Sequence, residues 1–245
     1  MKDNFEKTGK QANMHSHSKC DSFGKDRAKF YDQDNSYLAP IYENLHYLIK
    51  IVLGDFATQS KILCVGVGTG TEIIKLAEAF PGFTFVAVDP SESMLEVCRD
   101  RLQKLNLLDR CKLIHGSVQG LSEGGDFDAT LCLLVLHHTS EEDRKKIVAG
   151  IAERLKPTGY FIIAELSYDL YSRTSESIMK NWNSLARIAA TPDEKIQILP
   201  ESMREHLSIQ APSDIENMLV TNGFSTPTQF FQSLLIRAWY AQKKS

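Results

Sequence analysis

Apolar residues change their spacing along the chain. Between Phe30 and Val52 they recur at i, i+3 and i+4, which predicts a pair of amphipathic helices. Pro40 is expected in the first turn of the second helix, because proline is tolerated only there. From residue 61 onward, short apolar runs alternate with amphipathic stretches, a pattern typical of buried strands joined by helices.

Five near-continuous apolar runs predict strands: KILCVGV (61–67), FTFVAVD (83–89), CKLIHGSV (111–118), FDATLCLLVLHH (127–138) and YFIIAEL (160–166). Helices are predicted between them over TEIIKLAEAF (71–80), SESMLEVCRDRLQKLN (91–106) and the segment that Ser140 and Asp143 cap and Pro157–Gly159 stops. Apolar strands linked by helices indicate a parallel sheet covered on both faces.

The C-terminal third follows another pattern. Residues 167–211 form an irregular, partly helical insertion, and Ser213 with Glu216 predicts a capping box for a last helix that ends at Gly223. PTQFFQSLL and IRAWYAQ then predict two strands that are too close in sequence for a crossover helix, so they are expected to be antiparallel.

Composition argues against a membrane-spanning, a disulfide-rich and a strongly nucleic-acid-binding protein. A net charge of −3 and a pI near 6.2 argue against strong non-specific binding to DNA or acidic membranes, and no run of about 18 apolar residues predicts a transmembrane helix. The five cysteines are odd in number and form no Cys-x-x-Cys pair, which suits the cytoplasm. Residues 1–25 are polar and are expected to be a disordered tail.

The clearest chemical motif is a glycine-rich loop between a predicted strand and a predicted helix. Gly66, Gly68 and Gly70 permit a tight turn and close approach of a ligand to the backbone. Asp89 ends the next strand, where a carboxylate can accept hydrogen bonds from ribose hydroxyls. Alternatively, the glycines serve the turn alone and Asp89 caps the following helix. Together the two features favour a ribose-bearing cofactor, and Thr71 at the third glycine position argues against a dinucleotide.

Glycines at every second position, with ILCVGVGTG, VAVDPSESML, LIHGSV, FDATLCLLVLHH and LKPTGYFIIAE in this order, resemble class I S-adenosylmethionine-dependent methyltransferases over about residues 61–165. The resemblance implies an α/β, Rossmann-like fold with a seven-stranded, mostly parallel sheet, a reversed last strand and helices on both faces. It implies that Gly66, Gly68 and Gly70 lie against the methionine part and ribose, that Asp89 holds the ribose hydroxyls, that Ser117 and Val118 edge the adenine, and that Leu133 lies near the sulfonium.

Two positions depart from the family pattern. Cys64 stands where the family usually has an acid that helps to seat the methionine amino group. Ser117 stands where the family often has Asp for the adenine amino group, and a hydroxyl can serve there too.

The two ends of the chain carry a narrower resemblance. FYDQDNSYLAPIYENLHYLI and NMLVTNGFSTPTQFFQSLLIRAWYAQ look like the carboxy-S-adenosylmethionine synthase group and its small-molecule methyltransferase relatives. This implies that the N-terminal helices (26–60) and the insertion (167–211) lid the active site of a domain spanning 61–245. The arginine with which that synthase grips an extra carboxylate falls near Pro200, which favours ordinary S-adenosylmethionine unless Arg204 or Lys195 compensates.

A methyl sulfonium is already activated, so catalysis is expected to rest on positioning and on exclusion of water. Aromatic candidates beside the cation are Tyr31, Tyr42, Tyr171 and Trp182, each of which can equally belong to the core. A hydroxyl or ammonium acceptor needs a base, and His138 and Glu165 are the candidates at the ends of the fourth and fifth strands. Adjacent histidines on a strand face opposite sides, so His137 and His138 predict no metal site.

The sequence therefore predicts a methyltransferase that acts on a small molecule. Three alternatives stay open: a carboxy-S-adenosylmethionine synthase-like enzyme of tRNA modification, a nicotinamide-dependent oxidoreductase whose Tyr240-x-x-x-Lys244 comes late in the chain, and a non-catalytic domain that binds an adenosyl cofactor. Apolar strand edges and the two leading helices are compatible with a homodimer.

Overall fold

The computed structural model describes residues 25–122, 126–169, 172–188, 201, 203 and 205–245. The disordered tail predicted over 1–25 lies outside these residues except for its last position. Four side chains considered for the substrate side also lie outside them: Tyr171, Lys195, Pro200 and Arg204.

A single seven-stranded sheet organises the molecule, in the order β3-β2-β1-β4-β5-β7-β6. Its strands are β1 (Lys61–Val65), β2 (Thr84–Asp89), β3 (Cys111–His115), β4 (Phe127–Leu133), β5 (Leu155–Leu166), β6 (Thr228–Ser233) and β7 (Ile236–Gln242). The first five strands are parallel, and β7 is antiparallel to both β5 and β6. The predicted α/β fold with a reversed last strand is confirmed.

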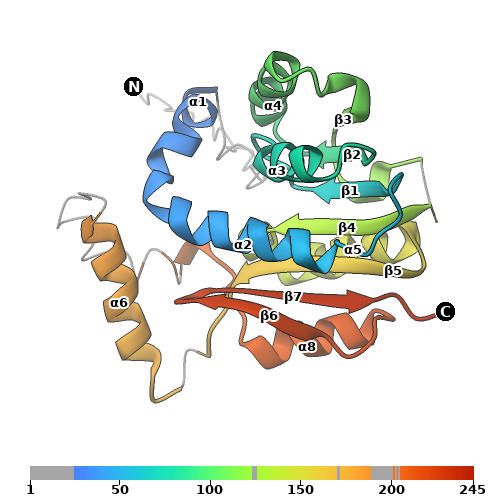
Figure 1. Ribbon diagram of the computed structural model, residues 1–245. Helices are drawn as coiled ribbons and strands as arrows, with labels where there is room; N and C mark the ends of the chain where they lie inside the picture. The colour runs from blue at the N-terminus through green and yellow to red at the C-terminus, as the bar shows by residue number, and fades with distance from the viewer. Residues whose placement is uncertain (1–24, 123–125, 170–171, 189–200, 202, 204) are drawn as a thin grey trace, which may run out of the picture.

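Helices cover both faces of this sheet (Figure 1). One face packs against α2 (Ala39–Val52), α3 (Thr71–Ala79) and α4 (Glu92–Lys104), and the other against α5 (Glu141–Arg154) and α8 (Pro212–Thr221). The helices α1 (Lys25–Asp34) and α6 (Ser175–Ile188) lie beyond the carboxyl ends of the parallel strands. Four short 3₁₀ turns complete the description: η2 (Ser36–Leu38), η3 (Leu108–Arg110), η4 (Val118–Gly120) and η5 (Leu136–His138).

Alternation along the strands divides the core into two clusters. In β1, Ile62 and Cys64 point toward α2, α3 and α4, whereas Leu63 and Val65 point toward the layer that contains α5 and α8. Since both faces are covered, the central strands read as continuous apolar runs. Within the described residues, no helix has the length and hydropathy needed to cross a membrane.

Several predicted boundaries are wrong, each for a local reason. The helix after Ser140 does not stop at Pro157–Gly159, because α5 passes directly into β5 at Leu155, which already pairs with Phe127. The capping box at the last helix does not form. Ala211 is the N-cap without a side-chain bond, and the Glu216 carboxylate instead accepts a 3.0 Å hydrogen bond from the Trp239 indole.

Candidate functional site

The glycine loop between β1 and α3 is held in a left-handed backbone conformation. Gly66, Gly68 and Gly70 have φ values of 69°, 53° and 80°, which residues other than glycine rarely adopt. The Gly66 amide donates a 2.8 Å hydrogen bond to the Val88 carbonyl, so the loop is fixed against the end of β2.

The three glycines meet different surroundings. A Cβ atom at Gly66 would lie 2.5 Å from Val135, and one at Gly70 would lie 2.5 Å from the Cys98 sulfur, so packing alone requires glycine at both. A Cβ atom at Gly68 would meet nothing within 4 Å. The backbone of Gly68 therefore faces open space, where a ligand can approach it closely.

Asp89 lies directly beside this open position. Its Oδ2 accepts a 2.8 Å hydrogen bond from the Gly68 amide, and its Oδ1 accepts one of 2.8 Å from the Ser91 amide. The residue is 7% exposed, and burial raises the pKa of the carboxyl. A carboxylate offers about four lone-pair directions, so both oxygens retain acceptor capacity for hydroxyl groups of a ligand.

The alternative that Asp89 only caps the following helix does not hold, because another residue caps α4. The hydroxyl of Ser91, not the Asp89 carboxylate, caps α4 by accepting from the Met94 amide at 3.3 Å. Asp89 spans the gap between the glycine loop and the start of α4, which leaves it central to the site.

Glu72 adds a second carboxylate to the site. It lies in the first turn of α3, where its carboxylate is hydrogen-bonded to its own backbone amide. Burial is the largest cause that raises its pKa to about 8, and the carboxylates of Asp89 and Asp32 raise it further. Since Cys64 is a fully buried thiol within electrostatic range of Glu72, the acidic group in this region comes from the helix and not from β1.

Beyond β3, the chain turns at Gly116, whose amide donates a 3.0 Å bond to the Asp89 carbonyl. Ser117 is exposed, whereas Val118 is 1% exposed and contacts the segment of α5 around Gly150. The Ser117 side chain is thus accessible to a ligand that lies over Asp89, and Val118 offers only its backbone.

The end of β4 departs from the sequence prediction. The strand stops at Leu133, which is half-buried, and Leu134 takes a left-handed backbone conformation at φ 61°. The histidines that follow lie in η5, not on a strand. Their ring centroids are 4.2 Å apart, so the prediction that His137 and His138 face opposite sides is wrong.

Glu165, at the end of β5, is 3% exposed and is fully engaged with η5. Its Oε1 accepts from the Leu136 amide at 2.8 Å. Its Oε2 accepts from the His137 amide at 2.9 Å and pairs with His137 Nδ1 at 2.7 Å. Because each oxygen holds part of the η5 backbone, the contacts of Glu165 are those of a group that orients the turn.

The two histidines therefore occupy different environments. His137 is 4% exposed and bound to Glu165, whereas His138 is half-buried at the rim of the turn. Of the two histidines, His138 is the more accessible to an acceptor. No cluster of metal-ligating side chains occurs within the described part of the chain.

Aromatic side chains gather on the N-terminal helices. Tyr31 in α1, Tyr37 in η2 and Tyr42 in α2 are half-buried, and Tyr31 and Tyr37 both lie within electrostatic range of Tyr42. Burial raises the pKa of the Tyr42 hydroxyl, which keeps it protonated. Trp182, in contrast, is 7% exposed and belongs to the core.

Comparisons with known proteins agree with this geometry. Residues 62–159 match the family model described as a methyltransferase domain. A demethylmenaquinone methyltransferase from Clavibacter sepedonicus is 30% identical over 207 residues, which are 79% of this chain and 82% of that protein. The chain belongs to the class I S-adenosylmethionine-dependent methyltransferase family.

Two other proteins are similar over most of the chain. A carboxy-S-adenosyl-L-methionine synthase from Methylococcus capsulatus is 25% identical over 221 residues, 89% of each protein. A solved protein of Methanococcus maripaludis, also assigned as an S-adenosyl-L-methionine-dependent methyltransferase, shares the fold with a TM-score of 0.66 and 21% identity, covering 97% of this chain and 98% of its own. Several other solved methyltransferases are longer, and this chain spans 50% to 58% of them.

The site fits the cofactor of this methyltransferase family, S-adenosylmethionine. Open space at Gly68 admits a ligand to the loop, and Asp89 offers acceptors for two hydroxyls. The carboxylates of Asp89 and of ionised Glu72 favour a ligand with positive charge, whereas Asp32 is already paired with Arg101. Sequence reasoning missed Asp32 and Glu72, since neither stands in a motif that a strand–loop–helix pattern identifies.

Proposed function

We propose that this methyltransferase transfers the methyl group of S-adenosylmethionine to a small-molecule acceptor by in-line displacement. The observation that carries the proposal is the pairing of Gly68 and Asp89. The loop amide is bonded to the carboxylate at 2.8 Å, and the space over the glycine is open. A ribose that lies over Gly68 reaches the free lone pairs of Asp89.

The roles proposed for the other residues of the cofactor site follow from their positions around Gly68 and Asp89. Gly66 and Gly70 shape the loop so that Gly68 can be approached, and the exposed hydroxyl of Ser117 binds at the adenine edge. The backbone of Val118 supports the same edge. Leu133 and Tyr31, both half-buried, supply an apolar and an aromatic wall.

When bound, S-adenosylmethionine supplies an electrophilic methyl group on a sulfonium. The protein holds the acceptor in line with that methyl group, and such positioning contributes on the order of 7–11 kcal/mol. In this proposal the N-terminal helices and α6, which lie beyond the carboxyl ends of the parallel strands (Figure 1), exclude water from the site, and the half-buried Tyr31 and Tyr42 supply aromatic rings for the cation.

Proton removal from the acceptor is assigned to His138. A neutral imidazole accepts a proton at physiological pH, and His138 is accessible at the rim of η5. Glu165 acts through the same turn. By binding the Leu136 and His137 amides it fixes η5, which makes it a positioning residue rather than a group that touches the acceptor.

The names of relatives support a small acceptor. Methyltransferases of demethylmenaquinone and of ubiquinone biosynthesis are among the similar proteins, and both names indicate a small-molecule substrate. A cytoplasmic location agrees with the unpaired cysteines of the described residues, Cys64, Cys98, Cys111 and Cys132. A homodimer through the N-terminal helices is a further part of the proposal.

A carboxy-S-adenosylmethionine synthase-like activity is the second candidate, because the similarity to that enzyme extends over 89% of the chain. Charge separates the two candidates. An additional carboxylate on the cofactor would need a cationic partner, and the cation described at the loop, Arg101, is already bonded to Asp32 and Thr69, so the ordinary cationic cofactor is favoured.

Mass spectrometry of small molecules released from the freshly purified protein tests the cofactor, and calorimetric titration with S-adenosylhomocysteine measures its affinity. Asp89→Asn is expected to weaken binding at least about tenfold, through loss of charged acceptors. Asp100→Asn, an exposed position on α4, is the matched control and leaves the affinity unchanged. Release of a carboxylated cofactor would favour the second candidate, and no binding of any adenosyl compound would refute both.

A further inference from the structure

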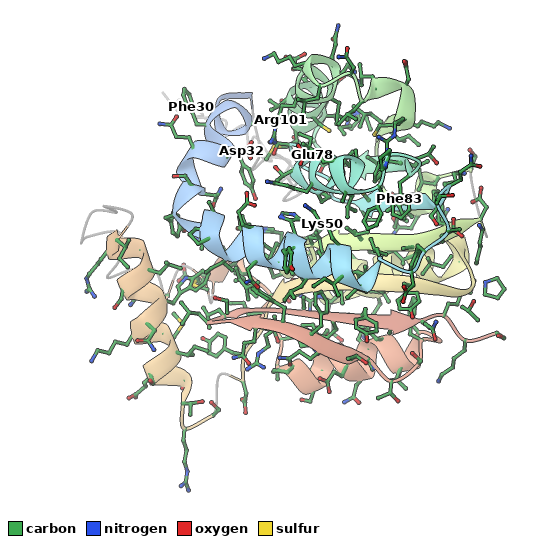
Figure 2. All side chains as sticks on the ribbon, viewed as in Figure 1. Phe30, Asp32, Lys50, Glu78, Phe83 and Arg101 are labelled. Atoms are coloured by element: carbon green, nitrogen blue, oxygen red, sulfur yellow. The ribbon has the colours of Figure 1, made fainter. Side chains whose placement is uncertain are left out.

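The N-terminal helix is bonded to the glycine loop through one acidic side chain. Thr69 lies inside the loop and is 4% exposed, and its hydroxyl donates a 2.8 Å hydrogen bond to Asp32 Oδ1 on α1. The other oxygen of Asp32 pairs with Arg101 Nη1 on α4 at 2.9 Å. Figure 2 shows Asp32 and Arg101 facing each other between these helices.

Arg101 completes the connection from the side of the loop. Its Nη1 lies 2.9 Å from the Thr69 carbonyl, 2.8 Å from the Thr69 hydroxyl and 3.0 Å from the Thr71 hydroxyl. One guanidinium therefore touches the loop backbone, the first residue of α3 and the carboxylate of α1. Thr69 lies between Gly68 and Gly70, so any movement of α1 that breaks these bonds also frees the segment that faces the cofactor.

The helix α1 is short, and few of its described side chains are buried. The helix has ten residues, KDRAKFYDQD, and an isolated helix of that length is marginal in water. Among its described side chains Ala28 is buried, whereas Phe30 is 55% exposed and Gln33 is exposed. Asp32 thus gives α1 a polar contact with the glycine loop and α4, in addition to the packing of the buried Ala28 and the half-buried Tyr31.

We propose that Asp32 and Arg101 form a latch that couples closure of α1 to the conformation of the glycine loop, so that the cofactor leaves only when the latch opens. Both are positioning residues, since they act through Thr69 and α1. The proposal rests on the proposed function, because it concerns release of the same cofactor.

The side chains of Asp32 and Arg101 are 49% and 30% exposed, so the ion pair itself adds little to global stability. Breaking it is expected to leave the protein folded. The chain also contains a matched control. Glu43 on α2 pairs with Lys75 on α3 at 2.9 Å, so this pair also joins an N-terminal helix to a helix that covers the sheet, but it does not touch the loop.

The experiment measures two quantities on the full chain: the dissociation rate of S-adenosylhomocysteine by stopped-flow displacement, and hydrogen–deuterium exchange of residues 28–34 and 66–71 without ligand. Asp32→Asn and Arg101→Gln are expected to raise the dissociation rate about tenfold, the effect of about 1.4 kcal/mol. Both variants are also expected to increase exchange in the two segments together. Glu43→Gln is expected to change neither quantity.

A double variant separates a latch from two independent effects. If Asp32 and Arg101 act as one latch, the double variant Asp32→Asn, Arg101→Gln releases the ligand more slowly than the product of the two single effects predicts. Additive rates, or exchange that rises in α1 but not in the loop, would overturn the latch. A wild-type protein that binds no adenosyl compound would refute the proposed function, while the exchange data would still decide whether α1 and the loop open together.

Discussion

The backbone amide of Gly68 is bonded to the carboxylate of Asp89 at 2.8 Å, which joins the turn after β1 to the end of β2. This bond lies at the centre of the proposed cofactor site. Gly68 leaves open space for a ligand, and Asp89 supplies a carboxylate that can accept hydrogen bonds from it.

Two substitutions in the glycine loop are expected to differ in their effects on cofactor affinity and on unfolding free energy. Gly68→Ala places a methyl group in open space at φ 53°, so we expect about 1–2 kcal/mol of destabilisation from the backbone and loss of cofactor binding. Gly70→Ala brings Cβ to 2.5 Å from the Cys98 sulfur and is expected to destabilise the fold more. Thermal unfolding and titration with S-adenosylhomocysteine measure both effects. Normal affinity in Gly68→Ala would show that the ligand binds elsewhere.

Substitution of Glu165 is expected to lower stability, whereas substitution of His138 is expected to lower kcat. Glu165→Gln removes one charged acceptor from η5 and leaves a buried amide opposite His137, so we expect a loss of about 1–3 kcal/mol in unfolding free energy. His138→Gln is expected to lower kcat about a hundredfold, with little change in Tm.

Chemical denaturation and methyl transfer, once an acceptor is known, test that contrast. Equal loss of stability in both variants would contradict the separation of positioning and base. Asp100→Asn, the exposed position on α4 used above as a control, is expected to have no effect on kcat.

Cofactor affinity is expected to increase with pH across the neutral range. The pKa of Glu72 in the free protein is about 8, so at pH 7 the carboxyl is mostly protonated. A positively charged ligand favours the ionised form and thus releases a proton on binding. Above pH 8 the group is already ionised, and the increase in affinity from this group levels off.

Titration of S-adenosylmethionine at pH 7.0, in buffers of different ionisation enthalpy, measures that proton release, because S-adenosylmethionine carries the sulfonium charge that S-adenosylhomocysteine lacks. Glu72→Gln is expected to remove it, whereas Glu78→Gln, an exposed glutamate on the same helix, retains it. Identical proton release in the wild type and Glu72→Gln would assign the effect to another group.

Acid is expected to destabilise the protein through His46. Burial lowers the pKa of His46 to about 4, whereas the unfolded chain has the ordinary value of about 6.5. Between these values the unfolded state binds more protons, so stability falls as the pH falls.

Between pH 7 and pH 5, the wild type is expected to lose about 2 kcal/mol more unfolding free energy than His46→Gln. Urea denaturation at the two pH values measures the difference. The same loss in both proteins would mean that His46 is not the group responsible.

The order of the elements in the sequence predicts the glycine loop and Asp89, but it does not predict the contact between Asp32 and Arg101. Gly66, Gly68, Gly70 and Asp89 follow two consecutive strands of a parallel sheet, so the fold brings them to one edge. Asp32 and Arg101 come from helices far apart in the sequence, and no local pattern links a polar helix to a loop of another element.

The end of β4 illustrates a second limit. CLLVLHH reads as one apolar strand, because hydrophobicity carries no information on the left-handed turn at Leu134. That single backbone angle ends the strand and brings His137 and His138 to the same side. The roles of the two histidines follow from the turn and not from strand alternation.

The place of β7 has a consequence for how the protein is synthesised. Residues 236–242 are translated after the other six strands, yet they occupy an inner position between β5 and β6. Until they leave the ribosome, β5 presents an open edge and β6 has no neighbour in the sheet. A nascent chain that stalls before residue 236 therefore exposes unpaired backbone to other polypeptides, and the sheet closes only as the final strand emerges.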